Sequence, residues 1–462
     1  MKIKVSEKLF GTDGIRAKAG QFPLDAVTVF RIGASLADQF AERLGRKPSF
    51  VIGRDTRESG QSILAAFYSG ATSRGAKCES AGIITTPGVA FIAGRYEFDA
   101  GVVISASHNP FADNGIKIFS PCGRKMDDET ERRIEEDIFS GSYIAGTEEE
   151  ITHPAGDRTK RREEFQNAYR DHLKEFFING YDLSGVKIVL DCANGAASAY
   201  APGLLRDLGA DVIAINDEPN GRNINKDCGS LHLEDLRQKV VETSANIGIA
   251  FDGDADRALF VDEKGEVVDG DGTLWILANY LVSKGKLSNR KVVATVMSNI
   301  GLEIALGNIG VGLIRANVGD KYVLESLLET DSELGGEQSG HIIVPENGLV
   351  GDGMMTMLFV LKAMREAART LSAMAAEFVS FPQVLVNVDV SRKTPFDEVD
   401  AIACEKALLE EELTGKGRLL LRYSGTENLA RVMIEGQDED VISHQATRLA
   451  QVIAAELGGS IR

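Results

Sequence analysis

Three aspartates stand at alternate positions in the segment GIAFDGDADRALFVDEKGE, residues 248–266. Asp252, Asp254 and Asp256 follow an apolar run that predicts a strand. Carboxylates this close repel one another unless a hard cation neutralises them, and an all-oxygen ligand set suits Mg²⁺. An EF-hand is excluded, because Arg257 replaces its required glycine and strands flank the loop. The segment predicts a magnesium site; an aspartyl-phosphate site with Asp252 as nucleophile and a solvated acidic turn stay open as alternatives.

A serine loop follows another apolar run in GVVISASHNPFADNGIKIF, residues 101–119. The G-x-S-x-G elbow of hydrolases is absent, which disfavours acyl transfer, although the partners of a Ser-His-Asp triad can be distant in sequence. Neighbouring residues of a strand point to opposite faces, so we do not expect His108 to act as a base for Ser107. Ser105 is expected to pack within the strand. From these letters alone Ser107 is a phosphate carrier, a nucleophile or part of a Ser/Asn turn that ends in proline.

A loop bracketed by glycines occurs in LGGEQSGHIIVPENG, residues 334–348, and contains Glu337, Ser339 and His341. Glycines let the backbone approach a ligand closely, and a carboxylate beside a hydroxyl is suited to vicinal sugar hydroxyls. A plain turn is the competing interpretation of this loop taken by itself.

The segment LLLRYSGTENLARVMIEG, residues 419–436, has the composition of a phosphate-binding loop. Backbone amides around a glycine, two hydroxyls and a guanidinium can surround a phosphate without a P-loop. A hairpin turn with a surface arginine is the alternative. The candidate phosphate ligands are Arg422, Ser424, Gly425, Thr426 and Arg431.

Two further cations stand beside glycine turns, Arg16 in FGTDGIR and Lys117 in NGIKIF. Lys117 follows Ser107 beyond an Asp-Asn-Gly turn, so the chain can return to the same place. There Lys117 would serve as an acid or base if its pKa were lowered.

The elements that must position these residues repeat one pattern three times, in residues 50–84, 186–215 and 291–316. Each contains an apolar run, a polar or glycine loop, a helical stretch and another apolar run. Continuous apolar strands joined by helices are typical of a sheet covered on both faces, so three similar α/β domains are expected.

The C-terminal part differs in kind, because QVLVNVDVS alternates like a half-exposed strand. An acidic helix (396–413), two strands and a last helix (438–457) follow, which predicts an α+β domain. A polar stretch at 140–164 predicts a linker, with a helix at about 160–178. The predicted domains are 1–155, with the serine loop; 156–256, ending in the aspartate loop; 257–370, with the Glu337 loop; and 371–462, with the phosphate loop.

Composition limits the possible partners. The chain has 462 residues, too many for one core, and a net charge of −18 from 69 acidic and 51 basic residues. This charge argues against nucleic acid or an anionic membrane as partner. Neither a secretory signal nor an apolar run of membrane-spanning length is visible in the sequence, and the five scattered cysteines suit a reducing cytoplasm.

Taken together and in this order, FGTDGIR, SASHNP, DGDADR, GEQSGH and RYSGTEN closely resemble the motifs of the α-D-phosphohexomutases over essentially the whole chain. GEQSGH, MSNIGL, DCANGAA and GIAFDGDADR look most like the phosphoglucosamine mutase branch, and the phosphoglucomutase/phosphomannomutase branch usually has another residue in place of Gln338. Tyr423 and Asn428 depart from the family pattern, which bears on the rigidity of the phosphate loop and on sugar preference.

The resemblance implies a fold with three related α/β mixed-sheet domains and a C-terminal TBP-like α+β domain around one cleft. It also implies roles by position. Ser107 would carry a phosphoryl group and, with the three aspartates, bind one Mg²⁺ per subunit. Glu337 and Ser339 would bind sugar hydroxyls. The remaining roles would be orientation or proton transfer by Arg16, His108, Lys117, Arg257 and His341, and phosphate binding by Arg422, Ser424, Gly425, Thr426 and Arg431.

The activity implied is the interconversion of glucosamine 6-phosphate and glucosamine 1-phosphate, through phospho-Ser107 and a hexosamine 1,6-bisphosphate that also acts as activator. A phosphoglucomutase or phosphomannomutase is the alternative in the same class. A non-catalytic phosphosugar-binding protein is the alternative in another class. A small phosphosugar is the expected partner, the cytoplasm the expected location, and a homodimer the habit of the family.

Overall fold

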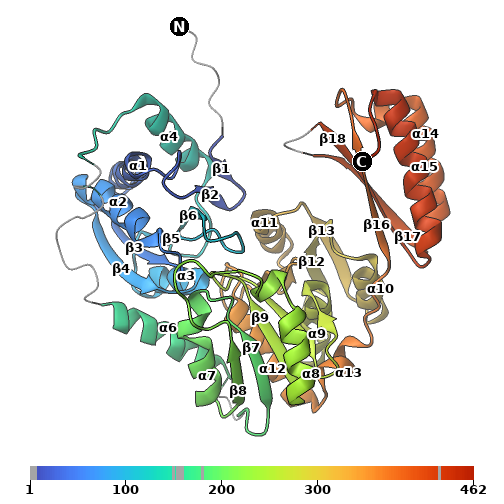
Figure 1. The fold of residues 1–462 in the computed structure, drawn as a ribbon, viewed down its shortest axis with the longest axis horizontal. Helices are drawn as coiled ribbons and strands as arrows, with labels where there is room; N and C mark the ends of the chain where they lie inside the picture. Colours follow the sequence, from blue (N-terminus) through green and yellow to red (C-terminus); the bar gives the residue numbers. More distant parts are fainter. Residues whose placement is uncertain (1–7, 148–150, 152–160, 178–181, 425–427) are drawn as a thin grey trace. The chain divides into compact units, whose positions relative to one another are not determined.

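Figure 1 shows the computed structural model, which describes residues 8–147, 151, 161–177, 182–424 and 428–462. Its strands form four sheets, of six, five, four and three strands in chain order. The first three sheets have parallel pairs, and the last is wholly antiparallel. The expected fold of three α/β domains and a smaller α+β domain is therefore confirmed.

The first sheet has the strand order β1-β2-β6-β5-β3-β4. β3 pairs in parallel with β4 and β5, whereas β6 is antiparallel to β5 and β2. Every residue of β5 is buried, as a strand covered on both faces requires. The elements are β1 (Phe10–Gly11), β2 (Gly14–Lys18), α1 (Ala26–Leu44), β3 (Ser49–Arg54), α2 (Gly60–Ser73), β4 (Lys77–Ile83), α3 (Thr86–Arg95), β5 (Ala100–Ile104), β6 (Asp113–Phe119) and α4 (Asp128–Ser140).

Glycines bring α1 and α2 into backbone contact. A Cβ atom on Gly33 would collide with the carbonyl of Phe67, and one on Gly70 would collide with the carbonyl of Phe30. A side chain at either position would separate the two helices, so both glycines are required by close approach rather than by backbone angle.

The second sheet has the order β11-β10-β9-β7-β8, with β7 parallel to β8 and β9, and β10 antiparallel to β9. The helix expected at about 160–178 is α6. The aspartate loop connects β9 to β10 at the carboxyl end of β9. The elements are α6 (Arg162–Phe177), β7 (Lys187–Asp191), η1 (Ala196–Ala199), α7 (Ala201–Asp207), β8 (Asp211–Ile215), η2 (Gly229–Leu231), α8 (Glu234–Thr243), β9 (Ile247–Phe251), β10 (Ala258–Asp262) and β11 (Val267–Val268).

The third sheet has the order β13-β12-β14-β15, and the Glu337 loop joins its two shortest strands, β14 and β15. Asp352 accepts a hydrogen bond from the backbone N–H of Met355 and so caps α12. The elements are α9 (Gly270–Ser283), β12 (Lys291–Thr295), α10 (Ile300–Asn308), β13 (Gly312–Ala316), α11 (Asp320–Thr330), β14 (Gly335–Gly336), β15 (Ile342–Ile343), α12 (Gly353–Ala367) and α13 (Leu371–Ala375).

The fourth sheet has the order β16-β18-β17, and α14 and α15 supply most of the helical part of its core. The acidic helix expected from residue 396 begins as α14 at Asp400, because a short 3₁₀ turn, η3, precedes it. The elements are β16 (Gln383–Asp389), η3 (Phe396–Glu398), α14 (Asp400–Leu413), β17 (Gly417–Tyr423), β18 (Leu429–Gly436) and α15 (Glu439–Leu457).

The chain divides into two compact units. Unit 1 comprises Met1–Thr295 and Ile314–Ala376, and unit 2 comprises Val296–Leu313 and Glu377–Arg462. Within the part of the chain that the structure describes, no helix combines the length and the apolar character that crossing a membrane requires.

Candidate active site

Ser107 lies in the loop between β5 and β6, buried, with its hydroxyl directed at the aspartate loop. Its backbone is left-handed, with φ at 52°. The hydroxyl donates a short hydrogen bond to Oδ2 of Asp252 and lies 3.3 Å from Nδ1 of His108. The structure therefore brings together the serine and the aspartate that stand 145 residues apart in the sequence.

The three aspartates form one buried cluster at the end of β9. One carboxylate oxygen from each of Asp252, Asp254 and Asp256 lies within 4.8 Å of the other two. Burial and the two neighbouring carboxylates raise the pKa of Asp252 well above its ordinary value. Oδ1 of Asp254 and Oδ1 of Asp256 are buried without a hydrogen-bond partner among the described residues. Unsatisfied, mutually repelling oxygens of this kind fit a hard cation such as Mg²⁺.

Lys117 reaches this cluster from β6 and is fully buried. Its ammonium lies 2.9 Å from Asp254, 3.0 Å from Asp256 and 3.0 Å from Asp13. Burial lowers the pKa of Lys117, but the three carboxylates outweigh burial and raise that pKa well above its ordinary value. The lowered pKa under which Lys117 would act as an acid or base is therefore not found, and Lys117 is a cation in this arrangement.

A cavity of about 370 Å³ adjoins the cluster within unit 1. Four of the predicted site residues line it together with Asp256. Nε of Arg16 and Nε of Arg257 are buried and lack a hydrogen-bond partner among the described residues, so cationic donors face this region unsatisfied. The predicted residues that line the cavity are Arg16, Asp256, Arg257, Glu337 and His341.

The two site histidines have opposite electrostatic surroundings. Burial and the guanidiniums of Arg257 and Arg16 lower the pKa of His108 to about 4. Burial also lowers the pKa of His341, but Asp256, 3.7 Å from its Nδ1, outweighs this and raises the pKa to about 9. At neutral pH His108 is a neutral base beside Ser107, and His341 is a cation at the cavity wall.

Glu337 and Ser339 occupy the tight connection between β14 and β15. The Ser339 hydroxyl donates to Oε2 of Glu337 over 3.2 Å, and the N–H of Gly319 donates to Oε1 over 3.1 Å. Glu337 thus faces the cavity with its carboxylate already oriented. Gln338 instead donates to Asp269 over 3.1 Å, away from Glu337.

The candidate phosphate residues belong to unit 2. Arg422 on β17 and Arg431 on β18 stand directly opposite each other. Burial and the Arg431 charge lower the pKa of Arg422, so two guanidiniums repel at this point. Such a pair suits an anion. Ser424 follows β17, and Gly425 and Thr426 lie outside the described residues.

Sequence reasoning missed two charged residues, Asp13 beside Lys117 and Lys393 beside Ser424. Asp13 lies within the FGTDGIR motif, of which only Arg16 was assigned a role. Lys393 was also assigned no role, and it donates to the carbonyl of Ser424 over 2.7 Å. Tyr423, a departure from the family pattern, stacks on Phe396 with ring centroids 4.1 Å apart. A charged residue within a recognised motif was the available signal for Asp13; Lys393 offered none.

Two expectations about the serine loop were wrong. Ser105 does not merely pack in the strand, because its hydroxyl donates to Asp55 over 2.7 Å and accepts from the N–H of Ser107 over 2.9 Å. His108 does not point away from Ser107, because the left-handed backbone at Ser107 ends the strand alternation on which that expectation rested.

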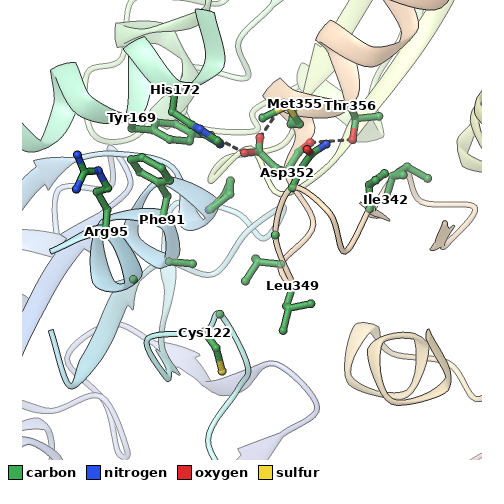
Figure 2. A pocket seen from close by; sticks show the side chains of 18 of the residues that line it. Phe91, Arg95, Cys122, Tyr169, His172, Ile342, Leu349, Asp352, Met355 and Thr356 are labelled. Carbon is green, nitrogen blue, oxygen red and sulfur yellow. Dashed lines mark hydrogen bonds between the residues drawn. The ribbon is translucent and has the colours of Figure 1, made fainter. Parts of the chain in front are cut away.

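A second cavity in unit 1, of about 300 Å³, is lined by residues that include Phe91, Ile342 and Leu349 (Figure 2). Phe91 stacks on His172 at one side, and the Tyr169 hydroxyl donates to Oδ2 of Asp352 over 2.8 Å. Asp352 is half-buried among these groups, and the residue before it, Gly351, packs against the ring of His341.

Comparison with known families gives four consecutive matches. They are "Phosphoglucomutase/phosphomannomutase, alpha/beta/alpha domain I" at residues 7–144, domain II at 167–265, domain III at 269–381, and the C-terminal domain at 385–452.

Curated relatives cover almost the whole chain. Phosphoglucosamine mutase of Solibacter usitatus is 45% identical over 98% of this chain and 100% of its own. Phosphoglucosamine mutase of Citrifermentans bemidjiense is 46% identical over 99% of this chain and 100% of its own.

Solved structures agree in fold. A phosphoglucomutase/phosphomannomutase family protein of Burkholderia thailandensis superimposes with a TM-score of 0.79 at 21% identity, over 98% of each chain. Aspergillus fumigatus N-acetylphosphoglucosamine mutase, solved with GlcNAc-6P and magnesium, gives a TM-score of 0.62 at 19% identity, over 97% of this chain and 96% of its own.

Proposed function

Because the chain belongs to the phosphoglucomutase/phosphomannomutase family, we propose that it is a phosphoglucosamine mutase. The enzyme is an isomerase that interconverts glucosamine 6-phosphate and glucosamine 1-phosphate. The curated relatives with this name match over nearly their full length, which supports this member of the family over the glucose and mannose enzymes.

The observation that carries the proposal is the hydrogen bond from the Ser107 hydroxyl to Asp252. Ser107 is the serine of the SASHNP loop whose hydroxyl reaches the aspartate loop, whereas the hydroxyl of Ser105 donates to Asp55. Phospho-Ser107 would transfer its phosphoryl group to the C1 hydroxyl of glucosamine 6-phosphate, which gives the 1,6-bisphosphate and free Ser107. Ser107 would then take the 6-phosphoryl group from the bisphosphate, which releases glucosamine 1-phosphate.

Asp252, Asp254 and Asp256, with an oxygen of phospho-Ser107, would hold Mg²⁺. The ion would supply neutralisation of the charge that develops on the phosphoryl oxygens. The unpartnered carboxylate oxygens of Asp254 and Asp256 support this assignment.

The residues around Ser107 provide the rest of the chemistry. Lys117, Arg16, Arg257 and His341 are cations that would stabilise the transferring phosphoryl group. Neutral His108, 3.3 Å from the Ser107 hydroxyl, would hold the serine proton when Ser107 attacks and return it when Ser107 leaves.

Each unit of the chain has its own candidate binding residues. Glu337 and Ser339 would bind sugar hydroxyls at the cavity wall, and Arg422, Ser424, Gly425, Thr426 and Arg431 would bind the phosphate that is not reacting. The repulsion between Arg422 and Arg431 supports an anion between them.

Three further expectations, on domain boundaries, cellular location and oligomeric state, also remain proposals. The domain boundaries are placed at residues 155/156, 256/257 and 370/371. A cytoplasmic location rests on five cysteines that are all free thiols. A homodimer, which analytical ultracentrifugation would detect, rests on the family habit alone.

A substrate panel tests the proposal. Wild type and Ser107→Ala are assayed on the 6-phosphates of glucosamine, glucose and mannose, after priming with the matching 1,6-bisphosphate. We expect glucosamine 6-phosphate to give the highest kcat/KM and Ser107→Ala to lose at least 10³-fold in rate on it, about 4 kcal/mol of barrier. A glucose or mannose rate equal to the glucosamine rate would reassign the enzyme within the family.

A further inference from the structure

A buried guanidinium lies beneath the serine loop and contacts no part of the cavity. Arg57, in the segment after β3, is wholly buried with its partner Asp55. We propose that Arg57 and Asn225, named together the carbonyl clamp, are positioning residues that fix the direction of the Ser107 hydroxyl in phosphoryl transfer. This inference rests on the proposed function, since it names what holds the nucleophile of that reaction.

Arg57 uses all five of its N–H donors at this place. Nε donates to Asp55 over 2.9 Å, and the other four donors reach backbone carbonyls of the loop that contains Ser107. The accepting carbonyls are those of Ser107 (2.9 Å), Asn109 (2.8 Å), Pro110 and Asp113 (3.1 Å). One side chain therefore gathers the carbonyls of four loop residues around a single planar group.

Asn225 supplies the second half of the clamp from the second α/β domain. Its amide donates to the carbonyl of Ser107 over 2.8 Å and to that of Asn109 over 3.0 Å. The carbonyl of Ser107 therefore has two donors, which arrive from different domains. The same approach excludes a side chain at Gly253, where a Cβ atom would lie 2.6 Å from that carbonyl oxygen.

The amide of Ser107 is held as firmly as its carbonyl. The N–H of Ser107 donates to the hydroxyl of Ser105, which donates to Asp55, the carboxylate that also binds Arg57. Both backbone groups of Ser107 thus lead to the one Asp55–Arg57 pair.

These hydrogen bonds stabilise an unfavourable backbone conformation at Ser107. Ser107 has φ at 52°, a region that costs a non-glycine residue on the order of 1 kcal/mol or more. In that conformation its hydroxyl points at Asp252. Without the donors on its carbonyl, the loop would relax toward ordinary angles and turn the hydroxyl away from the aspartates. Misplacement of a reacting group by about 1 Å can cost on the order of 10²-fold in rate.

Asn225→Asp is the decisive variant, because it keeps the shape of the side chain and replaces both N–H donors with an acceptor that repels the two carbonyls. We expect kcat to fall by about 10² with KM for the phosphosugar within twofold of wild type, since the clamp touches no substrate. Asn167→Asp, the same chemical change on exposed α6, is the matched control and should leave kcat unchanged. Arg57→Lys, which keeps the charge but not the five-donor fork, should lower kcat in the same way.

Measuring the phosphorylated enzyme distinguishes a failure of the clamp from a failure of the proposed function. After incubation with the 1,6-bisphosphate, intact-mass measurement should show a slower gain of one phosphoryl group in Asn225→Asp than in wild type. A kcat within twofold of wild type in folded Asn225→Asp would overturn the clamp. A rise in KM that accounts for the whole loss, or a melting temperature below the assay temperature, would equally reduce Asn225 to a structural role. Absence of the adduct in wild type would instead overturn the proposed function.

Discussion

The charges around Ser107 show how a buried site in an acidic protein becomes suited to a phosphate. The chain carries a net charge of −18, yet buried Lys117 and His341 and half-buried Arg257 meet at one place. Asp256 faces all three, at 3.0 Å from Lys117, 3.8 Å from Arg257 and 3.7 Å from His341, and Asp254 lies 2.9 Å from Lys117. Asp254 and Asp256 are also candidate metal ligands, so the lysine and a divalent cation draw on the same two carboxylates.

This sharing predicts the behaviour of Lys117→Met. Removing the ammonium leaves buried Asp254 and Asp256 and half-buried Asp13 without their shared cation, which should cost about 3–5 kcal/mol in the free energy of unfolding and abolish most activity. Mg²⁺ should then raise the melting temperature of Lys117→Met by more than it raises that of wild type, because the carboxylates are freed for it. Differential scanning fluorimetry with EDTA or Mg²⁺ measures both effects.

Lys47→Met, on an exposed lysine, is the control for that experiment and should respond to Mg²⁺ as wild type does. An equal Mg²⁺ response in wild type and Lys117→Met would contradict the shared use of Asp254 and Asp256.

At the scale of single residues, the sequence predicted which residues form the site better than it predicted their pKa values. Alternating aspartates repel wherever they are buried, so their chemistry could be inferred from spacing. The raised pKa of Lys117 could not, because it depends on Asp13 and Asp256, which approach it only after folding. Arg57 and Asn225 carried no signal either, since their partners are backbone carbonyls that no letter of the sequence distinguishes.

At the scale of elements, the loop that leads into α12 packs against His341 of the candidate active site. A Cβ atom on Gly351 would lie 2.5 Å from Cε1 and 2.6 Å from Cδ2 of His341, whose imidazole faces Asp256. Gly351→Ala should displace this ring, costing about 1–3 kcal/mol in stability from overpacking. We expect kcat to fall about tenfold, measured by steady-state kinetics.

Gly348→Ala provides the comparison, because a Cβ atom there meets nothing within 4 Å. If the effect passes through His341, Gly351→Ala should cause little further loss of kcat in a His341→Ala background. Additive losses in the double variant would show that Gly351 acts elsewhere.

The cap of the same helix predicts a pH dependence. Burial raises the pKa of Asp352 from 3.8 to about 6, against the hydrogen bonds from Met355 and Tyr169 that lower it (Figure 2). The folded protein therefore keeps a proton that the unfolded chain has lost between these two values. Stability from this group is greatest below the lower value and is lost as pH rises through about 6, on the order of 3 kcal/mol in all.

Asp352→Asn should remove that loss. The oxygen of an asparagine still caps the helix and its amide N–H can donate to the Tyr169 hydroxyl, but the side chain has no proton to give up. Urea unfolding at several values between pH 4.5 and 7 should show a flatter pH dependence than wild type, with higher stability at pH 7. Identical pH profiles for the two proteins would exclude Asp352 as the titrating group.

At the scale of the whole molecule, the repeated strand-loop-helix pattern was enough to predict the architecture. Three apolar repeats gave three α/β sheets, and the alternating C-terminal strands gave the antiparallel fourth. The short strands β14 and β15 were not predicted, because two-residue strands carry no periodicity. The division into two compact units, with Val296–Leu313 grouped with the C-terminal part, also lay beyond the pattern, since it depends on contacts between distant segments.

The most direct test of the account is the position of the phosphoryl group. The protein is incubated with glucosamine 1,6-bisphosphate and Mg²⁺, quenched in acid, digested and mapped by tandem mass spectrometry. We expect one phosphate on Ser107 that leaves again when glucosamine 6-phosphate is added, and none on Ser105 or in Ser107→Ala. A phosphate on Asp252, or on Ser107 but never returned to the sugar, would contradict the assignment of Ser107 as the phosphoryl carrier.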